Sequence, residues 1–299
     1  MRKIGVGLVV VTYALLLYMS LAAPAAWAHQ YLGPASGWLG AKLLALNCWV
    51  HPLLTCVAHR PWPLPSGPWV MKQTWHDLLF AHWPLPQAVM RPLLPAQLAL
   101  DTFDGQCWVG VIPFHMSGIR ARGLPPLPGL SRFPELNVRT YVTHGGKPGV
   151  YFFSLDAGNL PAVWVARRFY HLPYFHAGMS SKELGGNIQY GSRRLRGAAE
   201  FRGRYRPTGE THLREKGSVE SWLTERYSLY TTHDGQVYRG EIHHQPWPLQ
   251  DAEADFESNT VASAAGIPLP TTAPLLHFAR RLEVLIWPLR RAEWSQRRV

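Results

Sequence analysis

The sequence contains little cysteine. Only Cys48, Cys56 and Cys107 occur in 299 residues. Cys48 and Cys56 could pair only in an oxidising compartment, and not within one straight helix, where about 12 Å would separate them along the axis. Cys107 would then remain unpaired. These positions exclude a disulfide framework and match no zinc-binding spacing.

Charged residues are also scarce. They make up 16% of the chain against 47% hydrophobic residues, which excludes a disordered chain. The 26 prolines and 26 glycines are too dense for a helical bundle and are typical of many short strands joined by turns. Of the 30 basic residues only six are lysine. The arginines that dominate the net charge of +11 are spread along the chain, and no base-reading module accompanies them, so no nucleic-acid partner is expected.

The N-terminus has the pattern of a targeting or anchoring segment. Arg2 and Lys3 precede an uncharged apolar run over residues 4–23, and "AWA" at 26–28 fits a cleavage site. Residues 1–28 are therefore interpreted as a signal peptide or a membrane anchor, and 29–58 as a second apolar segment or linker. We expect export or membrane association through residues 4–28. A later start at Met71, or a two-span hairpin, would instead place the protein in the cytoplasm.

Residues 59–290 are expected to form one domain, followed by a basic tail at 291–299. Its fold class is α+β and predominantly antiparallel β, a closed or nearly closed barrel with a few short helices, preceded by an N-terminal hydrophobic helix. A strand is predicted over 75–83 and hairpins over 98–116, around 144–149 and around Asp234-Gly235. A helix is predicted over 161–173, because Pro161 suits a first turn. In "FRGRYR", Arg202, Arg204 and Arg206 would share one strand face.

Two stretches carry candidate chemistry. In a strand, Glu135, Asn137 and Arg139 would point to the same side as a polar row, and periodicity alone favours a solvated side. The stretch "ARRFYHLPYFHA", residues 166–177, gathers two arginines, four aromatic rings and two histidines around Pro173. It is either the wall of a site or a half-buried strand end. No nucleophile elbow and no diagnostic ligand spacing occur, so no metal or cofactor is expected.

Several long runs resemble one family. They are "HRPWPLPSGPW", "DLLFAHWPLP", "LDTFDGQCWVGVIPFHMSGI", "FPELNVRTYVTHGGKPGVYFFSLDAG" and "LTERYSLYTTHDGQVYRGEIHH". Together they resemble the bacterial YqjF-like family, DUF2071, over about residues 59–290. That family is distantly similar to acetoacetate decarboxylase. The resemblance implies a barrel with an enclosed pocket.

The decarboxylase pattern is matched only in part. Residues 162–175 align without a gap, and Arg167 and Pro173 match the decarboxylase arginine and proline. The lysine pair of the decarboxylase falls on Tyr174 and Phe175. Such an enzyme forms a Schiff base through a lysine amine, which neither residue can supply. Glu135 falls where one acidic site residue sits, which favours an inward orientation. The second glutamate and the site arginine of that family have no counterpart here.

The resemblance therefore implies a pocket for a small anionic or carbonyl-bearing molecule without a Schiff-base lysine. Glu135 and Tyr174 are the candidate acid–base pair. The candidate binding residues are Asn137, Arg139, Arg167, His171 and His176, with an arginine holding a carboxylate. An enzyme of this kind would have a lyase- or hydrolase-like activity on a small organic acid. The alternatives are a non-catalytic, membrane-tethered binding or sensory module, and a decarboxylase-like lyase. The sequence indicates no oligomeric state.

Overall fold

Tight turns set the strand boundaries. The computed structural model describes residues 51–292. Within it both residues of the pairs Asp104–Gly105, Gly145–Gly146, Gly185–Gly186 and Asp234–Gly235 have positive φ, between 48° and 77°. Two such residues in succession form turns whose twist matches that of the flanking strands. The turns predicted at 104–105, around 144–149 and at 234–235 are confirmed.

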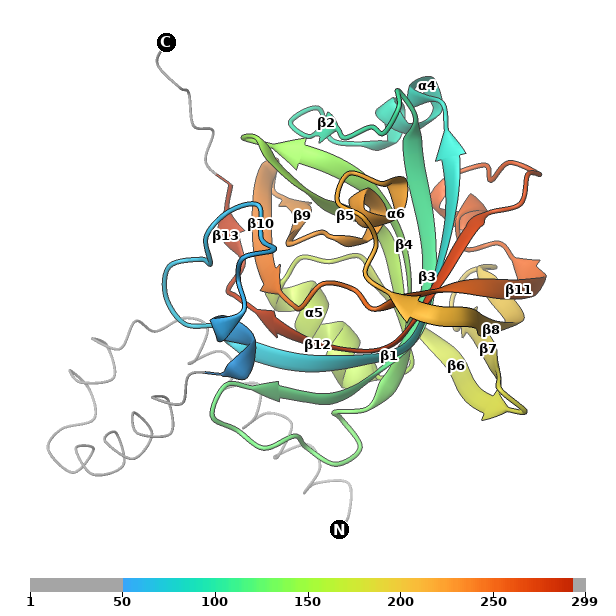
Figure 1. The fold of residues 1–299 in the computed structure, drawn as a ribbon, viewed down its shortest axis with the longest axis horizontal. Coiled ribbons are helices and arrows are strands. Elements are labelled where there is room, and N and C mark those ends of the chain that lie inside the picture. The colour runs from blue at the N-terminus through green and yellow to red at the C-terminus, as the bar shows by residue number, and fades with distance from the viewer. Residues whose placement is uncertain (1–50, 293–299) are drawn as a thin grey trace, which may run out of the picture.

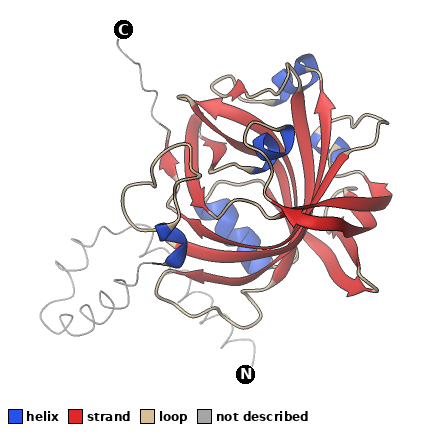
Figure 2. Ribbon diagram, in the orientation of Figure 1, coloured by secondary structure: helices blue, strands red, loops and turns tan. Residues whose placement is uncertain are grey.

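The strands between these turns are long. The first seven are β1 (Met71–Leu85), β2 (Ala99–Leu100), β3 (Cys107–Ala121), β4 (Phe133–His144), β5 (Lys147–Ala157), β6 (Tyr174–Leu184) and β7 (Asn187–Arg194). The others are β8 (Glu200–His212), β9 (Ser228–His233), β10 (Gln236–His243), β11 (Leu249–Asn259), β12 (Leu275–Ile286) and β13 (Arg290–Arg291). Figure 2 shows how few helices accompany them: α4 (Gln87–Met90), α5 (Leu160–Phe169), α6 (Val219–Thr224) and the 3-10 turns η1 (Pro52–Thr55), η2 (Arg91–Leu93) and η3 (Ser263–Ala265).

The described strands form one 13-stranded sheet that closes on itself twice (Figure 1). β5 is one branch point, because it pairs with β4 along one edge and with both β6 and β9 along the other. β12 is the second, because it pairs with β1 along one edge and with both β10 and β11 along the other. One circuit runs β4-β5-β6-β7-β8-β11-β12-β1-β3, and the other runs β4-β5-β9-β10-β12-β1-β3. The β5–β6 and β5–β9 pairs are parallel and the other pairs are antiparallel. The predominantly antiparallel fold with few short helices is confirmed.

Two of the strands shared by the circuits are buried on both faces, β4 over most of its length and β1 over residues 78–83. On β1, Leu79 and Ala81 belong to one hydrophobic core, whereas Leu78 and Phe80 belong to the other. A strand between two interiors has no solvated side, so its sequence shows little polar–apolar alternation. Any polar side chain on such a strand is removed from water and needs a partner. β4 belongs to both circuits, and Glu135 on β4 is therefore removed from water.

The hairpin predicted over 98–116 is only partly correct. Its turn forms, with Phe103 and Gln106 bridged, but β2 pairs with β4 and not with β3. Both edges of β3 are already occupied, by β1 and β4, so the preceding segment can join the sheet only beside β4. Strand β11 was not predicted. Its exposed acidic residues pair with the arginine face of β8, as in Arg204–Asp255 and Arg206–Glu253.

The predicted N-terminal hydrophobic helix, the signal peptide or anchor at 1–28, and most of the segment 29–58 lie outside the described residues. Within residues 51–292, no helix has the length and apolarity needed to cross a membrane. The proline-rich segment that follows belongs to the fold. Leu53, Leu54 and Leu64 pack against Trp69, Leu285 and Trp287.

Candidate functional site

A cavity of about 220 Å³ lies inside the second circuit, bounded by its strands and by α5. Its walls are mostly apolar. The polar side chains that line it are Gln73, Arg120, Glu135, Arg139, Asn159, Tyr170, Tyr174, Thr224, Arg226, Ser228 and His244, and Arg120 is only partly buried. A mostly apolar cavity with a few convergent polar groups is the usual form of a small-molecule site.

Helix α5 forms one wall. It begins at a good N-cap, because the Asn159 side chain accepts a hydrogen bond from Ala162 N at 3.1 Å and Pro161 follows. Ala162, Val165 and Ala166 line the cavity. Arg167 follows one residue later, about 100° around the helix, and is exposed. The expectation that Arg167 lines the pocket is therefore not met.

Glu135 and Tyr174 meet at the cavity wall. The Tyr174 hydroxyl donates a hydrogen bond to Glu135 Oε2 at 2.6 Å, from β6 to β4 across β5. Glu135 is 4% exposed. Burial raises the pKa of Glu135 to about 7, against a smaller lowering by the Tyr174 hydrogen bond and with a further rise from Asp156. Burial and the neighbouring carboxyl raise the pKa of Tyr174 well above its usual range.

Tyr190 fixes the backbone at this point. Its hydroxyl donates to the carbonyl oxygens of Glu135 at 2.7 Å and of Phe114 at 3.0 Å. The glutamate therefore extends from a strand that is held on both sides, by sheet pairing and by a buried tyrosine. A side chain that is held in this way keeps its orientation toward the cavity.

Two buried arginines line the same cavity. Arg139 is 9% exposed and donates from Nη2 to Tyr141 Oη and to the Leu223 carbonyl, both at 3.4 Å, while its Nε has no partner. No carboxylate among residues 51–292 forms an ion pair with it. Arg226 pairs with Asp101 and donates from Nε to the Trp222 carbonyl at 2.6 Å. Its Nη2 is buried without a partner. Unused N–H donors on buried arginines are suited to an anion.

The structure brings Glu135, Arg139 and Tyr174 together and places the other predicted site residues elsewhere. Asn137 is buried between Glu135 and Arg139, with its Oδ1 unpaired, and it is not part of the cavity lining. The solvated orientation that periodicity favoured for this row is wrong, because β4 belongs to both circuits.

Neither predicted histidine lines the cavity. His171 has φ +52° and its ring stacks on His233 with 3.8 Å between centroids. His176 lies two residues beyond Tyr174, about 7 Å further along β6, which is a strand of the first circuit. Both expectations as pocket residues are therefore corrected.

Sequence reasoning missed Arg226, His244 and Trp247, which all line the cavity. They lie some 90 to 110 residues after Glu135, on and around the β9–β10 hairpin, and no spacing signal connects them to it. Burial lowers the pKa of His244 to about 4, so the imidazole is neutral near pH 7.

No lysine lines the cavity in the described part of the chain. Tyr174 occupies the wall where the decarboxylase alignment would place a lysine. Phe175 points away from it and lies beneath the Arg194 guanidinium, 3.9 Å from ring centroid to Cζ. The cavity therefore offers acid–base and anion-binding groups without an amine nucleophile.

Comparison with known proteins agrees with this architecture. Residues 72–283 match the model of DUF2071, described as "Uncharacterized conserved protein". The chain belongs to this family. It is also 52% identical to "Uncharacterized protein YqjF" of Bacillus subtilis (strain 168) over 233 residues, which are 78% of this chain and 96% of that protein.

Solved structures with the same fold are much more distant in sequence. One is the enduracididine biosynthesis enzyme MppR complexed with pyruvate, at a TM-score of 0.54 and 9% identity, over 80% of this chain and 95% of that one. Another is an acetoacetate decarboxylase-like enzyme from Sphingomonas wittichii RW1, with a TM-score of 0.53 and 13% identity, over 79% of this chain and 98% of that one. A third is acetoacetate decarboxylase from Legionella pneumophila, with a TM-score of 0.52 and 11% identity, over 80% of this chain and 94% of that one. These similarities establish an acetoacetate decarboxylase-like fold for this DUF2071 protein.

Proposed function

We propose that the cavity of this DUF2071 protein binds a small carboxylic acid with an apolar body and a carbonyl group, and that Glu135 and Tyr174 move a proton on it. One observation carries the proposal. Two buried arginines with unused N–H donors and a glutamic acid with a pKa of about 7 line the same 220 Å³ cavity.

The arginines account for the anion. Arg139 has no carboxylate partner among the described residues, and removing an unpaired charge from water is costly. A ligand carboxylate would supply both the missing charge and hydrogen-bond acceptors for these two guanidinium groups. The apolar walls, including Trp75, Phe152 and Trp247, would contact the rest of the ligand.

Glu135 accounts for the chemistry. A carboxyl with a pKa of about 7 is present in both protonation states at neutral pH, which is the condition for efficient general acid–base catalysis. The carboxylate would take a proton from carbon next to the ligand carbonyl and return it to oxygen or carbon. Tyr174 remains protonated and would donate a hydrogen bond to the carboxylate or to the developing oxyanion.

The fold relatives support the ligand class but not their chemistry. Pyruvate, in the MppR complex, is a small oxo acid, and acetoacetate decarboxylase is named for another. Because no lysine of residues 51–292 lines the cavity, the proposal includes no Schiff base like that of the decarboxylase. The proposed step is therefore proton transfer through an enol or enolate without a covalent amine intermediate, and it becomes a lyase reaction when a leaving group departs from the carbon next to the enolate.

The test is a ligand screen on the full chain by thermal shift, with small oxo, hydroxy and aromatic acids, followed by product analysis. Arg139→Gln should weaken binding of the best acid at least about tenfold, since a charged hydrogen bond contributes roughly 1.5–3 kcal/mol. Arg167→Gln removes the same charge from the exposed side of α5 and should leave affinity unchanged. Equal affinity in Arg139→Gln and the wild type would refute the assigned anion site.

Glu135→Gln separates an enzyme from a binding module. If the protein is an enzyme, this variant should keep affinity for the acid within a few fold and lose turnover by about 100-fold or more. If the wild type binds an acid of the screen without converting it, the ligand-binding or sensory alternative is the correct one.

A further inference from the structure

A second cavity, of about 290 Å³, lies outside the first and shares no lining residue with it. It is bounded by the proline-rich segment at 62–66, the start of β5, strand β10 and the chain between β12 and β13. Its polar lining consists of Ser66, Lys147, Arg239, Glu241 and Arg290, with the indoles of Trp62 and Trp287 beside them.

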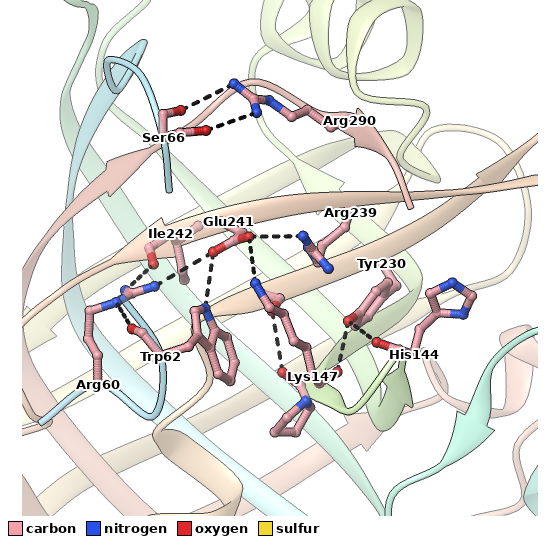
Figure 3. Close-up of polar contacts among 12 residues, drawn as sticks. Arg60, Trp62, Ser66, His144, Lys147, Tyr230, Arg239, Glu241, Ile242 and Arg290 are labelled. Atoms are coloured by element: carbon pink, nitrogen blue, oxygen red, sulfur yellow. Dashed lines mark hydrogen bonds and ion pairs between the residues drawn. The ribbon is translucent and has the colours of Figure 1, made fainter. Parts of the chain in front are cut away.

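Glu241 gathers the basic residues at one point (Figure 3). Its carboxylate is within ion-pair distance of Arg239 at 3.2 Å, Lys147 at 3.5 Å and Arg60 at 3.8 Å. It also accepts a hydrogen bond from Trp62 Nε1 at 3.1 Å. A single negative charge therefore serves three positive ones and leaves an excess of two.

Arg290 adds a further positive charge. It lies directly opposite Arg239 in the β10–β13 pair, so both side chains lie on the same face. Its guanidinium donates to the Ser66 carbonyl at 3.2 Å and to Ser66 Oγ at 3.4 Å, and no carboxylate of residues 51–292 forms an ion pair with it. Like charges directly opposite on neighbouring strands are destabilising unless an anion lies between them.

The wall opposite the strands is stiff. Pro63 and Pro65 fix two backbone angles, and the turn at Gly67 has φ +85°. Trp287 Nε1 donates to the Gly67 carbonyl at 2.9 Å and ties this segment to the end of β12. The basic groups therefore face a wall that is already in place, which lowers the entropic cost of binding a ligand.

We propose that this second cavity is a binding site for a phosphoryl group, held by Arg239, Arg290 and Lys147 with Ser66 Oγ as a neutral donor. Of the charged groups that line the cavity, Arg239, Arg290 and Lys147 against Glu241 leave an excess of two positive charges, which the charge of a phosphate monoester, close to −2, matches. Arginine forks suit its oxygens, and lysine acts as a point charge. The phosphoryl group could be that of a soluble phosphate monoester or of a phospholipid headgroup, and both present the same chemistry.

The experiment measures the full chain with two probes. The first is glycerol 3-phosphate, titrated by calorimetry at constant ionic strength with sodium chloride as the balancing salt. The second is sedimentation with vesicles of phosphatidylcholine containing phosphatidic acid, compared with pure phosphatidylcholine. Arg239→Gln and Arg290→Gln are the test variants, and Arg290 is exposed, so its loss should not affect folding. Arg196→Gln, on the exposed β7–β8 turn, removes the same charge elsewhere.

Each test variant should weaken binding of the responding probe at least about tenfold, whereas Arg196→Gln should match the wild type. A response to glycerol 3-phosphate identifies a soluble source, and a response confined to phosphatidic acid identifies a headgroup, and either supports the proposal. The proposal would be overturned if the wild type responded to neither probe, or if Arg196→Gln lost as much binding as the test variants. The acid screen of the first cavity is unaffected by these variants, so the two proposals can fail separately.

Discussion

Replacing Glu135 by glutamine should change how the stability of the protein depends on pH. The folded-state pKa of Glu135 is about 7, above its ordinary value of 4.5. Between these values the folded protein binds more protons than the unfolded chain. The stability contributed by the protonated carboxyl is therefore complete below pH 4.5 and is lost as pH rises through 7.

The magnitude follows from the size of the shift. A difference of about 2.5 pH units corresponds to about 3 kcal/mol, most of which should be lost between pH 5 and pH 8. Glu135 is only 4% exposed, so solvent screening does not reduce this figure appreciably. Glutamine keeps an oxygen that can accept the Tyr174 hydrogen bond and carries no charge at any pH, so the variant should lack this loss.

The assay is urea unfolding of the wild type and Glu135→Gln from pH 5 to pH 8, comparing the free energies of unfolding. The free energy of unfolding of the variant should increase relative to that of the wild type as pH rises. Glu210→Gln, an exposed carboxyl on β8, corrects for the change in net charge. Parallel curves for the wild type and Glu135→Gln would show that the buried carboxyl does not ionise in this range and would refute the assigned acid–base role.

Three further predictions concern the same wall and the sheet around it. Tyr174→Phe removes the hydrogen bond that lowers the pKa of Glu135, so the midpoint of the pH effect should move upward in the same unfolding assay. Burial lowers the pKa of His244 to about 4. The stability contributed by the neutral imidazole is therefore present above pH 6.5 and is lost as pH falls toward 4. His244→Gln should reduce this acid-induced loss in the free energy of unfolding. A Cβ at Gly149 would lie 2.7 Å from a backbone oxygen of β9, so Gly149→Ala should lower the free energy of unfolding by about 1–3 kcal/mol in a urea titration. At Gly178 the nearest atom to an added Cβ would be 3.9 Å away, so Gly178→Ala should leave the free energy of unfolding nearly unchanged.

Local patterns in the sequence determined the turns, several strands and one helix. Asp104–Gly105 and Asp234–Gly235 form the tight turns that their residue types favour, because both positions need positive φ. The alternation at 201–206 placed its arginines outward correctly, since β8 has one solvated face. Together with the family motifs, these signals predicted the antiparallel fold and the neighbourhood of Glu135 and Tyr174.

Pairing between distant strands could not be predicted in this way. β2 joins β4 because both edges of β3 are occupied, which is a property of the whole sheet. β11, "LQDAEADFESN", is rich in residues with low strand propensity, and its acidic side becomes favourable only opposite the arginines of β8.

The same distinction between local pattern and distant strand pairing applies to the candidate site. A period of two places Glu135 and Arg139 on one side of a strand, and that much follows from the sequence. Which side is buried depends on β4 belonging to two closed circuits, and that is decided by β5 pairing with β4, β6 and β9 at once. Arg226 reaches the same cavity from a segment some 90 residues later, because closure of the second circuit brings the end of α6 against β4. The sequence alone therefore determined the residue types and their local faces, whereas only closure of the sheet removed water from them and made them a site.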